Sequence, residues 1–471
     1  MNKYKNPFIK LLKWRDNYYC FDVNRNQLLK IPHSTFQELQ KVQKGIGSNE
    51  STEVASLINL GFLSEKRVKV IEHPQTADVD YLLNNKLSQI TLQITQDCNF
   101  RCSYCIYSDI NNNAQRSHTN KYMKIETAKE AVDYLYTHSG DVEKRSIGFY
   151  GGEPLLNFPL IESIVEYAEK LFSKTHCLFT MTSNCSLLND RIIEFLVAHD
   201  MHLVVSLDGS EKIQNKNRRY SANGKGSYKT VIRNINRIKE NYTQWFNSNV
   251  GLSMVIDPRN DYDEISSIFD VFSENRTINA VVLSDAYSLQ KVYYTEEFVY
   301  KQKYNQFLAF LEEIRNERVN GVSREARQLI DSMKKNMYRY IAIDRLPERQ
   351  IPSGPCVPGA TKMLVTVDGS LYPCERVSEL SQCMRIGSLK NGVNAERVKE
   401  MMNFAQQTAD QCKNCWAFLH CNHCLSYVDN NGIISAKAGL QFCKSTREQV
   451  ENELLDFAML HECRKMGLNG L

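Results

Sequence analysis

The stretch SQITLQITQDCNFRCSYC, residues 88–105, determines how the rest of the chain is interpreted. Its first part, Ser88–Thr95, has the pattern of a strand, and the turn after it carries Cys98, Cys102 and Cys105 in C-x3-C-x2-C spacing. Three thiolates can hold three irons of a [4Fe-4S] cluster, which leaves the fourth iron without a protein ligand. Clusters that are fully ligated by protein use four Cys, and zinc sites usually have four protein ligands, or three and a water. The spacing therefore predicts an open, reactive iron–sulfur cluster.

The length and composition are those of a globular protein with several domains. A chain of 471 residues predicts roughly two to four domains. The net charge of +4 gives no strong case for binding nucleic acid or a membrane surface. No apolar segment follows the first residues, and no apolar run approaches about 18 residues. We therefore expect neither a signal peptide nor a membrane span.

Most of the 15 Cys are crowded into two regions, Cys98–Cys105 and Cys356–Cys443. A secreted disulfide scaffold would be short and would carry a signal sequence. Local clusters in a large chain without a signal predict metal ligands in a reducing cytoplasm. Five other Cys are expected to be mostly small buried hydrophobic residues: Cys20, Cys177, Cys185, Cys383 and Cys463.

Residues 1–85 predict a small winged-helix-like domain. Three strand patterns separated by turn-forming residues precede two helical patterns. A polar linker is expected over Glu72–Asn85. The expected strands are Phe8–Trp14, Tyr18–Asp22 and Gln27–Ile31, and the expected helices are Ser34–Val42 and Glu53–Leu60.

From about residue 88 to 290, strand and helix patterns alternate, which predicts an α/β fold with parallel strands. Six such units would form a partial (β/α)6 barrel, in which chemistry occurs at the carboxyl ends of the strands. The three Cys follow the first of these strands. The expected strands are Gln89–Thr95, Ser146–Tyr150, Cys177–Ser183, His202–Leu207, Asn249–Ile256 and Asn279–Leu283, and the helices include Ile125–Thr137, Leu160–Phe172, Asp190–Ala198 and Tyr228–Glu240.

The rest of the chain predicts a bridging helix and a Cys-rich domain. Glu296–Val319 has apolar residues at helical spacing and is expected to pack between domains. Residues 350–445 have little regular periodicity, so metal clusters are expected to organise them. A closing helix is expected over Ser445–Cys463. The expected domains are therefore 1–85, 86–320 and 321–471.

Two further motifs follow the expected strands in order, GGEP at 151–154 and S-x-D-G at 206–209. Alone, each would usually be a simple turn. Together with C-x3-C-x-aromatic-C, they resemble the radical SAM superfamily over residues 88–290. The resemblance implies that Cys98, Cys102 and Cys105 ligate a [4Fe-4S] cluster whose fourth iron binds the amino and carboxylate groups of S-adenosylmethionine.

The resemblance also implies the residues that contact S-adenosylmethionine. Gly151 and Gly152 lack Cβ atoms and allow a close approach of the backbone to a ligand. Relatives often have T-N-G where this chain has Ser183-Asn184-Cys185, so Cys185 replaces a glycine. The implied contacts are Tyr104 beside the adenine, Gly151, Gly152, Glu153 at the ammonium, Asn184, and Ser206 and Arg218 at the ribose or the carboxylate.

Seven Cys in the C-terminal region form a second pattern. The core C-x2-C-x5-C-x2-C is as compatible with structural zinc as with iron–sulfur. The whole order resembles the SPASM extension of radical SAM enzymes, although Cys421 and Cys424 are separated by two residues where the family has three. The resemblance implies an outer auxiliary cluster on Cys412, Cys415, Cys421 and Cys443 and an inner one on Cys356, Cys374 and Cys424.

The inner cluster then lacks a fourth Cys. Either Cys383 supplies it, or one iron stays open and could hold a substrate thiolate, the soft ligand that suits such sites.

The first domain resembles the PqqD-like element that recognises leader peptides. In this mode an extended peptide adds a strand to a sheet edge, here Gln27–Ile31. The alternatives are a DNA-binding winged helix and a purely structural cap.

The whole chain resembles the maturases that form thioethers in Cys-rich peptides, the ranthipeptide and sactipeptide group. That implies a precursor peptide bound through its leader, and a 5′-deoxyadenosyl radical that abstracts hydrogen from a peptide carbon before a Cys sulfur joins it. It also implies two auxiliary [4Fe-4S] clusters that receive the surplus electron, and a reductant such as flavodoxin or ferredoxin.

Glu375, directly after Cys374, is the candidate base for the peptide thiol, since sulfatase-maturing relatives have Asp there. The alternative is that Glu375 is a solvated or cluster-adjacent glutamate and takes no part in catalysis. The alternatives for the whole protein are carbon–carbon peptide cross-linking, formylglycine-forming sulfatase maturation, and a metal-containing winged-helix regulator.

Overall fold

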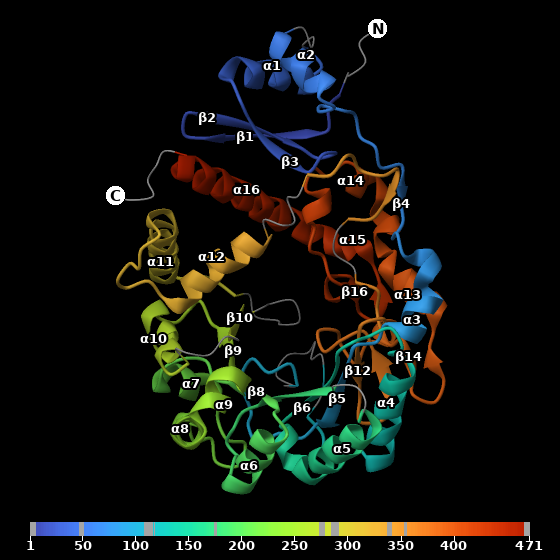
Figure 1. Ribbon diagram of the computed structural model, residues 1–471, viewed down its shortest axis with the longest axis vertical. Helices are drawn as coiled ribbons and strands as arrows, with labels where there is room; N and C mark the ends of the chain where they lie inside the picture. Colours follow the sequence, from blue (N-terminus) through green and yellow to red (C-terminus); the bar gives the residue numbers. More distant parts are fainter. Residues whose placement is uncertain are drawn as a thin grey trace.

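A ten-stranded sheet is the largest element of the fold, and its strand order is β10-β9-β8-β7-β6-β5-β12-β13-β14-β15. Figure 1 shows this sheet and its covering helices at one end of the molecule and the N-terminal domain at the other. The computed structural model describes residues 6–46, 51–107, 116, 118–173, 177–272, 278–283, 292–336, 342–352 and 356–465.

Six strands of this sheet are parallel and follow one another in chain order, which confirms the α/β class. In β5, Ile90, Leu92 and Ile94 are fully buried on one face of the sheet, whereas the buried residues of the other face, Thr91, Gln93 and Thr95, are polar. The curvature of a partial barrel stays a prediction. The six strands are β5 (Gln89–Thr95), β6 (Arg145–Gly151), β7 (Cys177–Ser183), β8 (His202–Ser206), β9 (Val250–Ile256) and β10 (Ile278–Val282).

Amphipathic helices cover the sheet. In α4, the buried residues Ala128, Ala131, Val132 and Leu135 recur at helical spacing and form the face that packs. The expected helices agree with the structure to within about a turn. The helices of this region are α4 (Ile125–Thr137), α5 (Phe158–Leu171), α6 (Asp190–Ala198), α7 (Glu211–Asn217), α8 (Tyr228–Asn241), α9 (Thr243–Asn249) and α10 (Tyr262–Ser266).

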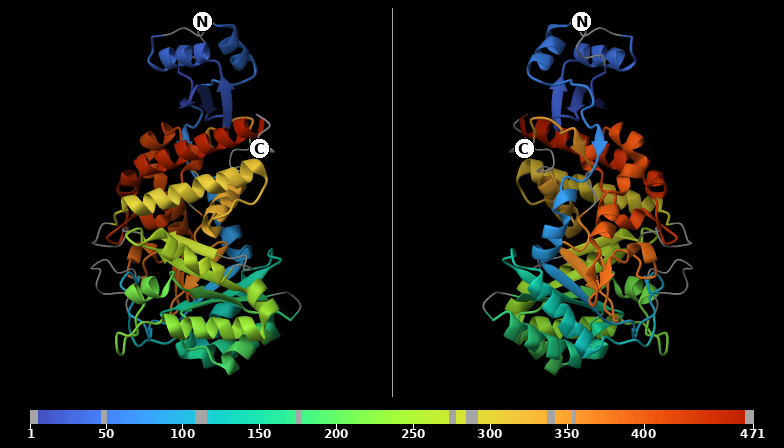
Figure 2. Two further views of the ribbon diagram at one scale, coloured as in Figure 1. Left: turned by 90° about the vertical axis from the view of Figure 1, so that its left-hand side faces the viewer. Right: turned by 90° about the vertical axis from the view of Figure 1, so that its right-hand side faces the viewer.

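The N-terminal domain is a three-stranded antiparallel sheet in the order β1-β2-β3 with two helices on it. Ser51 caps the second helix, because its side chain accepts a hydrogen bond from the Val54 N–H. Figure 2 shows this domain next to α16. Its elements are β1 (Ile9–Trp14), β2 (Asn17–Asp22), β3 (Gln27–Ile31), α1 (His33–Gln43) and α2 (Thr52–Asn59).

The linker expected over Glu72–Asn85 is wrong. This segment contains the helix α3 (Val79–Asn85), whose Val79 and Leu83 are buried. These two residues are four apart and share one helix face, which packs against α13 (Ala395–Met402). Just before it, β4 (Val70–Ile71) pairs with β11 (Arg349–Gln350).

The C-terminal region extends the large sheet, because β12 (Lys362–Val365) pairs in parallel with β5. The helix α11 (Glu296–Arg315) packs on α12 (Arg324–Asn336), yet Tyr300, Tyr304 and Phe307 on it are exposed. No described helix is long and apolar enough to cross a membrane. The remaining elements are β13 (Ser370–Tyr372), β14 (Gly387–Ser388), β15 (Gly392–Val393), α14 (Ala409–Lys413), β16 (Asp429–Asn430), β17 (Ile433–Ile434), α15 (Ala436–Gly439) and α16 (Cys443–Lys465).

Candidate active site

The three-cysteine turn lies at the carboxyl end of β5, against the end of β6. The Gly152 N–H donates to the Thr95 carbonyl at 2.9 Å, and the Glu153 N–H donates to the Asp97 carbonyl at 2.9 Å. The turn is therefore joined by backbone hydrogen bonds to the GGEP segment.

Gly151 and Gly152 are required by this contact. A Cβ on Gly151, whose φ is +138°, would lie 2.2 Å from the Thr95 carbonyl oxygen. A Cβ on Gly152 would lie 2.0 Å from the Asp97 carbonyl oxygen. These glycines were expected to make room for a ligand, whereas the close approach seen here is to the backbone that leads into Cys98.

The thiols of Cys98, Cys102 and Cys105 lie within electrostatic range of one another. Burial is the main reason that the pKa of each thiol is raised, and it brings the pKa of Cys102 to about 12. The neighbouring thiols of Cys102 and Cys105 raise the pKa of Cys98 further. Backbone N–H groups donate to two of the sulfurs, from Phe100 to Cys98 at 3.4 Å and from Tyr107 to Cys105 at 3.5 Å. Such donors suit thiolates, which metal ions generate from thiols.

Glu153 is buried at the end of β6, and burial raises its pKa to about 7. The Ser183 hydroxyl donates to its Oε1 at 2.7 Å, and the Asn184 N–H donates to its Oε2 at 2.7 Å. The carboxyl group thus already joins the end of β6 to the end of β7.

Asn184 and Cys185 form the turn after β7. The Asn184 side chain donates to Asn99 Oδ1 at 2.8 Å, so it holds the residue next to Cys98. Cys185 is fully buried and has a φ of +58°. The chain therefore keeps here the left-handed conformation that favours glycine, with a cysteine in its place.

Tyr104, Asp208 and Arg218 form a hydrogen-bonded network next to the cysteines, in which Asp208 is fully buried. Arg218 donates twice to Asp208, at 2.9 and 3.0 Å, and its guanidinium lies over the Tyr104 ring at 5.5 Å. The Tyr104 hydroxyl donates to Asp208, and burial raises the Tyr104 pKa well above its usual value. Sequence reasoning treated Asp208 only as a turn residue, although it lies in the S-x-D-G motif after Ser206, the partly buried last residue of β8.

Four thiols gather in the C-terminal region between α14 and the start of α16. Burial raises the pKa of Cys412, Cys421 and Cys443, and Cys415 raises all three further. The Cys415 N–H donates to the Cys412 carbonyl at 3.1 Å. These are the four residues predicted for the outer cluster.

Three other thiols gather beside β12 and β13. Burial raises the pKa of Cys356, the nearby thiols of Cys374 and Cys424 raise it further, and the resulting pKa is about 11. Cys383 is buried elsewhere, with its sulfur 3.2 Å from Ser381 Oγ and 3.6 Å from Asp429 Oδ1.

Glu375 lies next to Cys374 and pairs with Lys362, whose Nζ is 2.7 Å from Glu375 Oε1. Burial alone would raise the pKa of Glu375, but Lys362 outweighs burial and the pKa is lowered. Its Oε2 is buried and has no hydrogen-bond partner among the described residues.

Among the described residues, no three Cys, His, Asp or Glu side chains are arranged to hold a single metal ion. A structural zinc site would place four ligands about 2.0–2.3 Å from one ion. In a cubane, by contrast, each thiolate binds a different iron.

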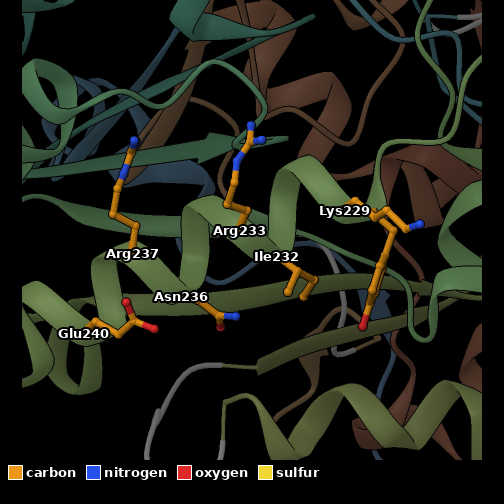
Figure 3. Close-up of a pocket in the computed structure, with 7 residues that line it drawn as sticks. Lys229, Ile232, Arg233, Asn236, Arg237 and Glu240 are labelled. Carbon is orange, nitrogen blue, oxygen red and sulfur yellow. The ribbon is translucent and has the colours of Figure 1, made fainter.

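A separate hollow of about 490 Å³ lies along α8 (Figure 3). All its lining residues belong to this helix, and none of them is a predicted site residue. One of them, Arg237, donates to the Leu188 carbonyl at 3.0 Å, so it serves the packing of α8. We assign this hollow no part in the site.

Comparisons with known proteins match this region to a family. Residues 92–272 match the Radical SAM superfamily. An uncharacterised protein of Methanocaldococcus jannaschii is 33% identical over 174 residues, which cover 37% of this chain and 54% of the relative. The radical SAM cyclopropyl synthase TigE of Paramaledivibacter caminithermalis is 25% identical over 203 residues, 42% of this chain and 41% of the relative. The chain thus spans only about half the length of these relatives.

Two further matches extend over most of the chain. A cysteine-type anaerobic sulfatase-maturating enzyme of Clostridium perfringens is 22% identical over 377 residues, 78% of this chain and 92% of the relative. The solved structure of native anSMEcpe with bound AdoMet and Cp18Cys peptide has a TM-score of 0.57 at 18% identity and covers 81% of this chain and 99% of that one, which shows a shared fold. The chain therefore contains a Radical SAM domain with maturases among its relatives, and this domain implies S-adenosylmethionine and a [4Fe-4S] cluster.

Proposed function

We propose that this protein is a radical SAM enzyme that installs thioether cross-links in a ribosomally made, Cys-rich precursor peptide. The observation that carries the proposal is the trio of partly buried cysteines on the turn after β5, which is hydrogen-bonded to the GGEP segment within the Radical SAM match. A trio leaves one iron of a cubane for a small ligand.

The residues around these three cysteines suit an iron–sulfur cluster with bound S-adenosylmethionine. Cys98, Cys102 and Cys105 would hold the cluster, and the implied contacts of S-adenosylmethionine would come from Tyr104, Gly151, Gly152, Glu153, Asn184, Ser206 and Arg218. When bound and reduced by a donor such as flavodoxin or ferredoxin, the two cofactors supply a 5′-deoxyadenosyl radical. The protein holds the cysteine turn in place and keeps it largely buried, which limits side reactions with water.

The inner auxiliary cluster is proposed to have an open iron. Cys356, Cys374 and Cys424 are electrostatic neighbours, while the Cys383 thiol is paired with Ser381 and Asp429. This separation supports three protein ligands, which leaves a position for a peptide thiolate. The outer set, Cys412, Cys415, Cys421 and Cys443, would ligate its cluster fully.

The leader peptide is proposed to bind at β3, an edge strand of the N-terminal sheet. A groove of about 340 Å³ lies beside it and is lined by Lys30, Ile31 and residues of α1 and α2. An added strand would use the free backbone groups of β3, and the groove would take its side chains.

Glu375 is proposed as the base for the peptide thiol. Its lowered pKa keeps it ionised, and its buried Oε2 has no partner among the described residues. The lowered pKa also makes it a weaker base than an ordinary glutamate, so iron would have to acidify the thiol.

Other peptide chemistries remain candidates because of the relatives. TigE is a cyclopropyl synthase, which favours carbon–carbon bond formation as an alternative. The sulfatase-maturating relative, matched over 92% of its length, favours formylglycine formation.

The test is anaerobic incubation of the reconstituted protein with S-adenosylmethionine, a strong reductant and the Cys-rich peptide encoded nearest to its gene. Thioether formation predicts a loss of two hydrogens per link and a blocked Cys at each link, found by mass spectrometry. A Cys98→Ala protein should release no 5′-deoxyadenosine. An unchanged peptide together with 5′-deoxyadenosine release would reject the substrate, and no 5′-deoxyadenosine at all would reject the radical chemistry.

A further inference from the structure

Arg116 is a buried cation between the two cysteine segments nearest the active site. Its side chain is 0% exposed, although arginine is almost never fully buried unless it is paired. Its Nη2 donates to the Glu375 carbonyl at 2.7 Å, and its N–H donates to the Ile106 carbonyl at 3.0 Å. The backbone of Arg116 thus contacts the residue after Cys105, while its side chain contacts the residue after Cys374.

The surroundings keep this guanidinium charged. Its Cζ lies 5.5 Å from the ring centre of Tyr107 and 5.4 Å from that of Tyr150, so it is held by two cation–π contacts. Burial lowers the pKa of Arg116, but Tyr107, Tyr150 and Glu379 outweigh this effect and the net pKa is raised. The positive charge is therefore permanent.

The protein compensates this charge only in part. The nearest carboxylate oxygen, Glu379 Oε2, is 3.9 Å from Arg116 Nε and also accepts a hydrogen bond from Gln93 at 2.6 Å. Arg116 Nε and Nη1 are buried and make no close hydrogen bond among the described residues, although the Tyr107 and Tyr150 side chains lie beside the guanidinium. A further anionic group nearby would therefore stabilise the buried charge.

A cubane on three thiolates is such a group, because it carries a net negative charge that increases by one on reduction. A nearby buried cation stabilises the more negative, reduced state, and net charge and hydrogen bonding are known determinants of cluster potential. The Arg116 guanidinium lies close to this segment, because it stacks on the ring of Tyr107, and the Tyr107 N–H donates to the Cys105 sulfur at 3.5 Å.

We propose that Arg116 is a positioning and redox-tuning residue whose buried charge raises the reduction potential of the cluster on Cys98, Cys102 and Cys105. The inference rests on the cluster assignment in the proposed function, but not on the identity of the peptide. Arg116 does not touch the reacting atoms in this scheme. It acts by stabilising the extra electron before S-adenosylmethionine is cleaved.

The experiment is a redox titration of the reconstituted holoenzyme, followed by electron paramagnetic resonance without any peptide. The active-site cluster is recognised as the signal that changes when S-adenosylmethionine is added. The variants are Arg116→Gln, which removes the charge, and Arg116→Lys, which keeps it. Arg101→Gln is the matched control, because Arg101 also lies beside these cysteines but is exposed to solvent.

Arg116→Gln should shift the midpoint of the active-site cluster to a more negative potential, whereas Arg116→Lys should stay close to wild type. The Arg101→Gln shift should be smaller, because solvent screens that charge. The outer cluster should not shift, since Arg116 is not among the groups that affect its cysteines.

Three results would overturn the proposal: an unshifted potential in Arg116→Gln, an equal shift in Arg116→Lys, or an equal shift of the outer cluster. A protein that takes up no site-differentiated cluster would instead contradict the proposed function. If Arg116→Gln does not fold, Arg116→Met is titrated in its place, because it also removes the charge while it keeps an apolar side chain against Tyr107 and Tyr150, and it should give the same negative shift.

Discussion

At the scale of single residues, Gly152 has the least space of any site residue, because its Cα faces the Asp97 carbonyl. We expect Gly152→Ala to push the cysteine turn away and to lower the free energy of unfolding by about 1–3 kcal/mol. A displacement of this turn should reduce S-adenosylmethionine cleavage by about 100-fold. Chemical denaturation and 5′-deoxyadenosine assays measure both effects.

Gly140→Ala is the matched control, since its Cβ would meet nothing closer than 3.6 Å, the distance to Asn85 Oδ1. It should behave like wild type in both measurements. Equal damage by the two substitutions would show that the contact of Gly152 with Asp97 has no special role.

Glu375 allows a second test at this scale. Glu375→Gln keeps the shape of the side chain but removes the charge that pairs with Lys362. If Glu375 is the base, thioether formation should fall by about 100-fold or more while 5′-deoxyadenosine release without product persists. Product formation at the wild-type rate, measured by mass spectrometry, would leave Glu375 without a catalytic role.

Substitution of Cys383 and Cys424 tests whether the inner cluster has Cys383 as a fourth ligand or has an open iron. Cys424→Ala should lower the iron content by up to about four atoms per chain, because it removes a proposed ligand. Cys383→Ala should leave the iron content unchanged, since its thiol pairs with Ser381 and Asp429. Iron loss in Cys383→Ala, measured on reconstituted protein, would restore Cys383 as a ligand.

At the scale of elements, local patterns were sufficient where an element depends on its own sequence. The bounds of β5, β7, α4 and α6 agree with the expected ones, because their periodicity and their boundary residues are local signals. The helix α3 was mistaken for a linker because only Val79 and Leu83 mark its buried face. The pairing of β12 with β5 joins segments far apart in the chain, and a single sequence holds no signal for it.

The edge strand β3 gives the prediction at this scale. Ser56 is exposed and lines the groove beside β3, whereas the neighbouring Ala55 is exposed and does not line it. Ser56→Trp should fill the groove and weaken leader binding at least about tenfold, a loss of about 1.4 kcal/mol. Ala55→Trp is the control, and calorimetry with a synthetic leader measures both affinities. Equal binding by the two variants would exclude the groove, and peptide-free S-adenosylmethionine cleavage should be unchanged in both.

At the scale of the whole molecule, the resemblance predicted two sets of C-terminal cysteine ligands, and that ligand assignment stays a prediction. The thiols of each set affect one another's pKa in the structure. The contacts between segments that carry the cysteines were not predictable. Nothing in the spacing indicated that Arg116 would reach Glu375 or that Asp208 would join Tyr104 to Arg218. Such side chains meet only after the segments that follow β5, β8 and β13 have been assembled.

The N-terminal domain was expected to be a separate unit, yet it is joined tightly to the rest. Phe8, Leu12 and Phe21 belong to the large core, and Asn26 Oδ1 lies 2.8 Å from His420 Nε2 in the C-terminal region. Two ion pairs link the domain to α16, Lys10–Glu451 at 2.8 Å and Lys30–Glu462 at 2.7 Å. A leader bound at β3 would therefore lie on a domain that is packed against the rest of the chain.

Cooperative unfolding is the consequence of these contacts. Leu39 is fully buried in the small core inside the N-terminal domain, and Leu12 is buried in the large core. Either substitution, Leu39→Ala or Leu12→Ala, should cost about 2–5 kcal/mol. If the domain unfolds together with the rest, Leu39→Ala lowers the same single calorimetric transition as Leu12→Ala. A separate early transition in Leu39→Ala, with the main transition unmoved, would mean that the leader site is independent of the catalytic part after all.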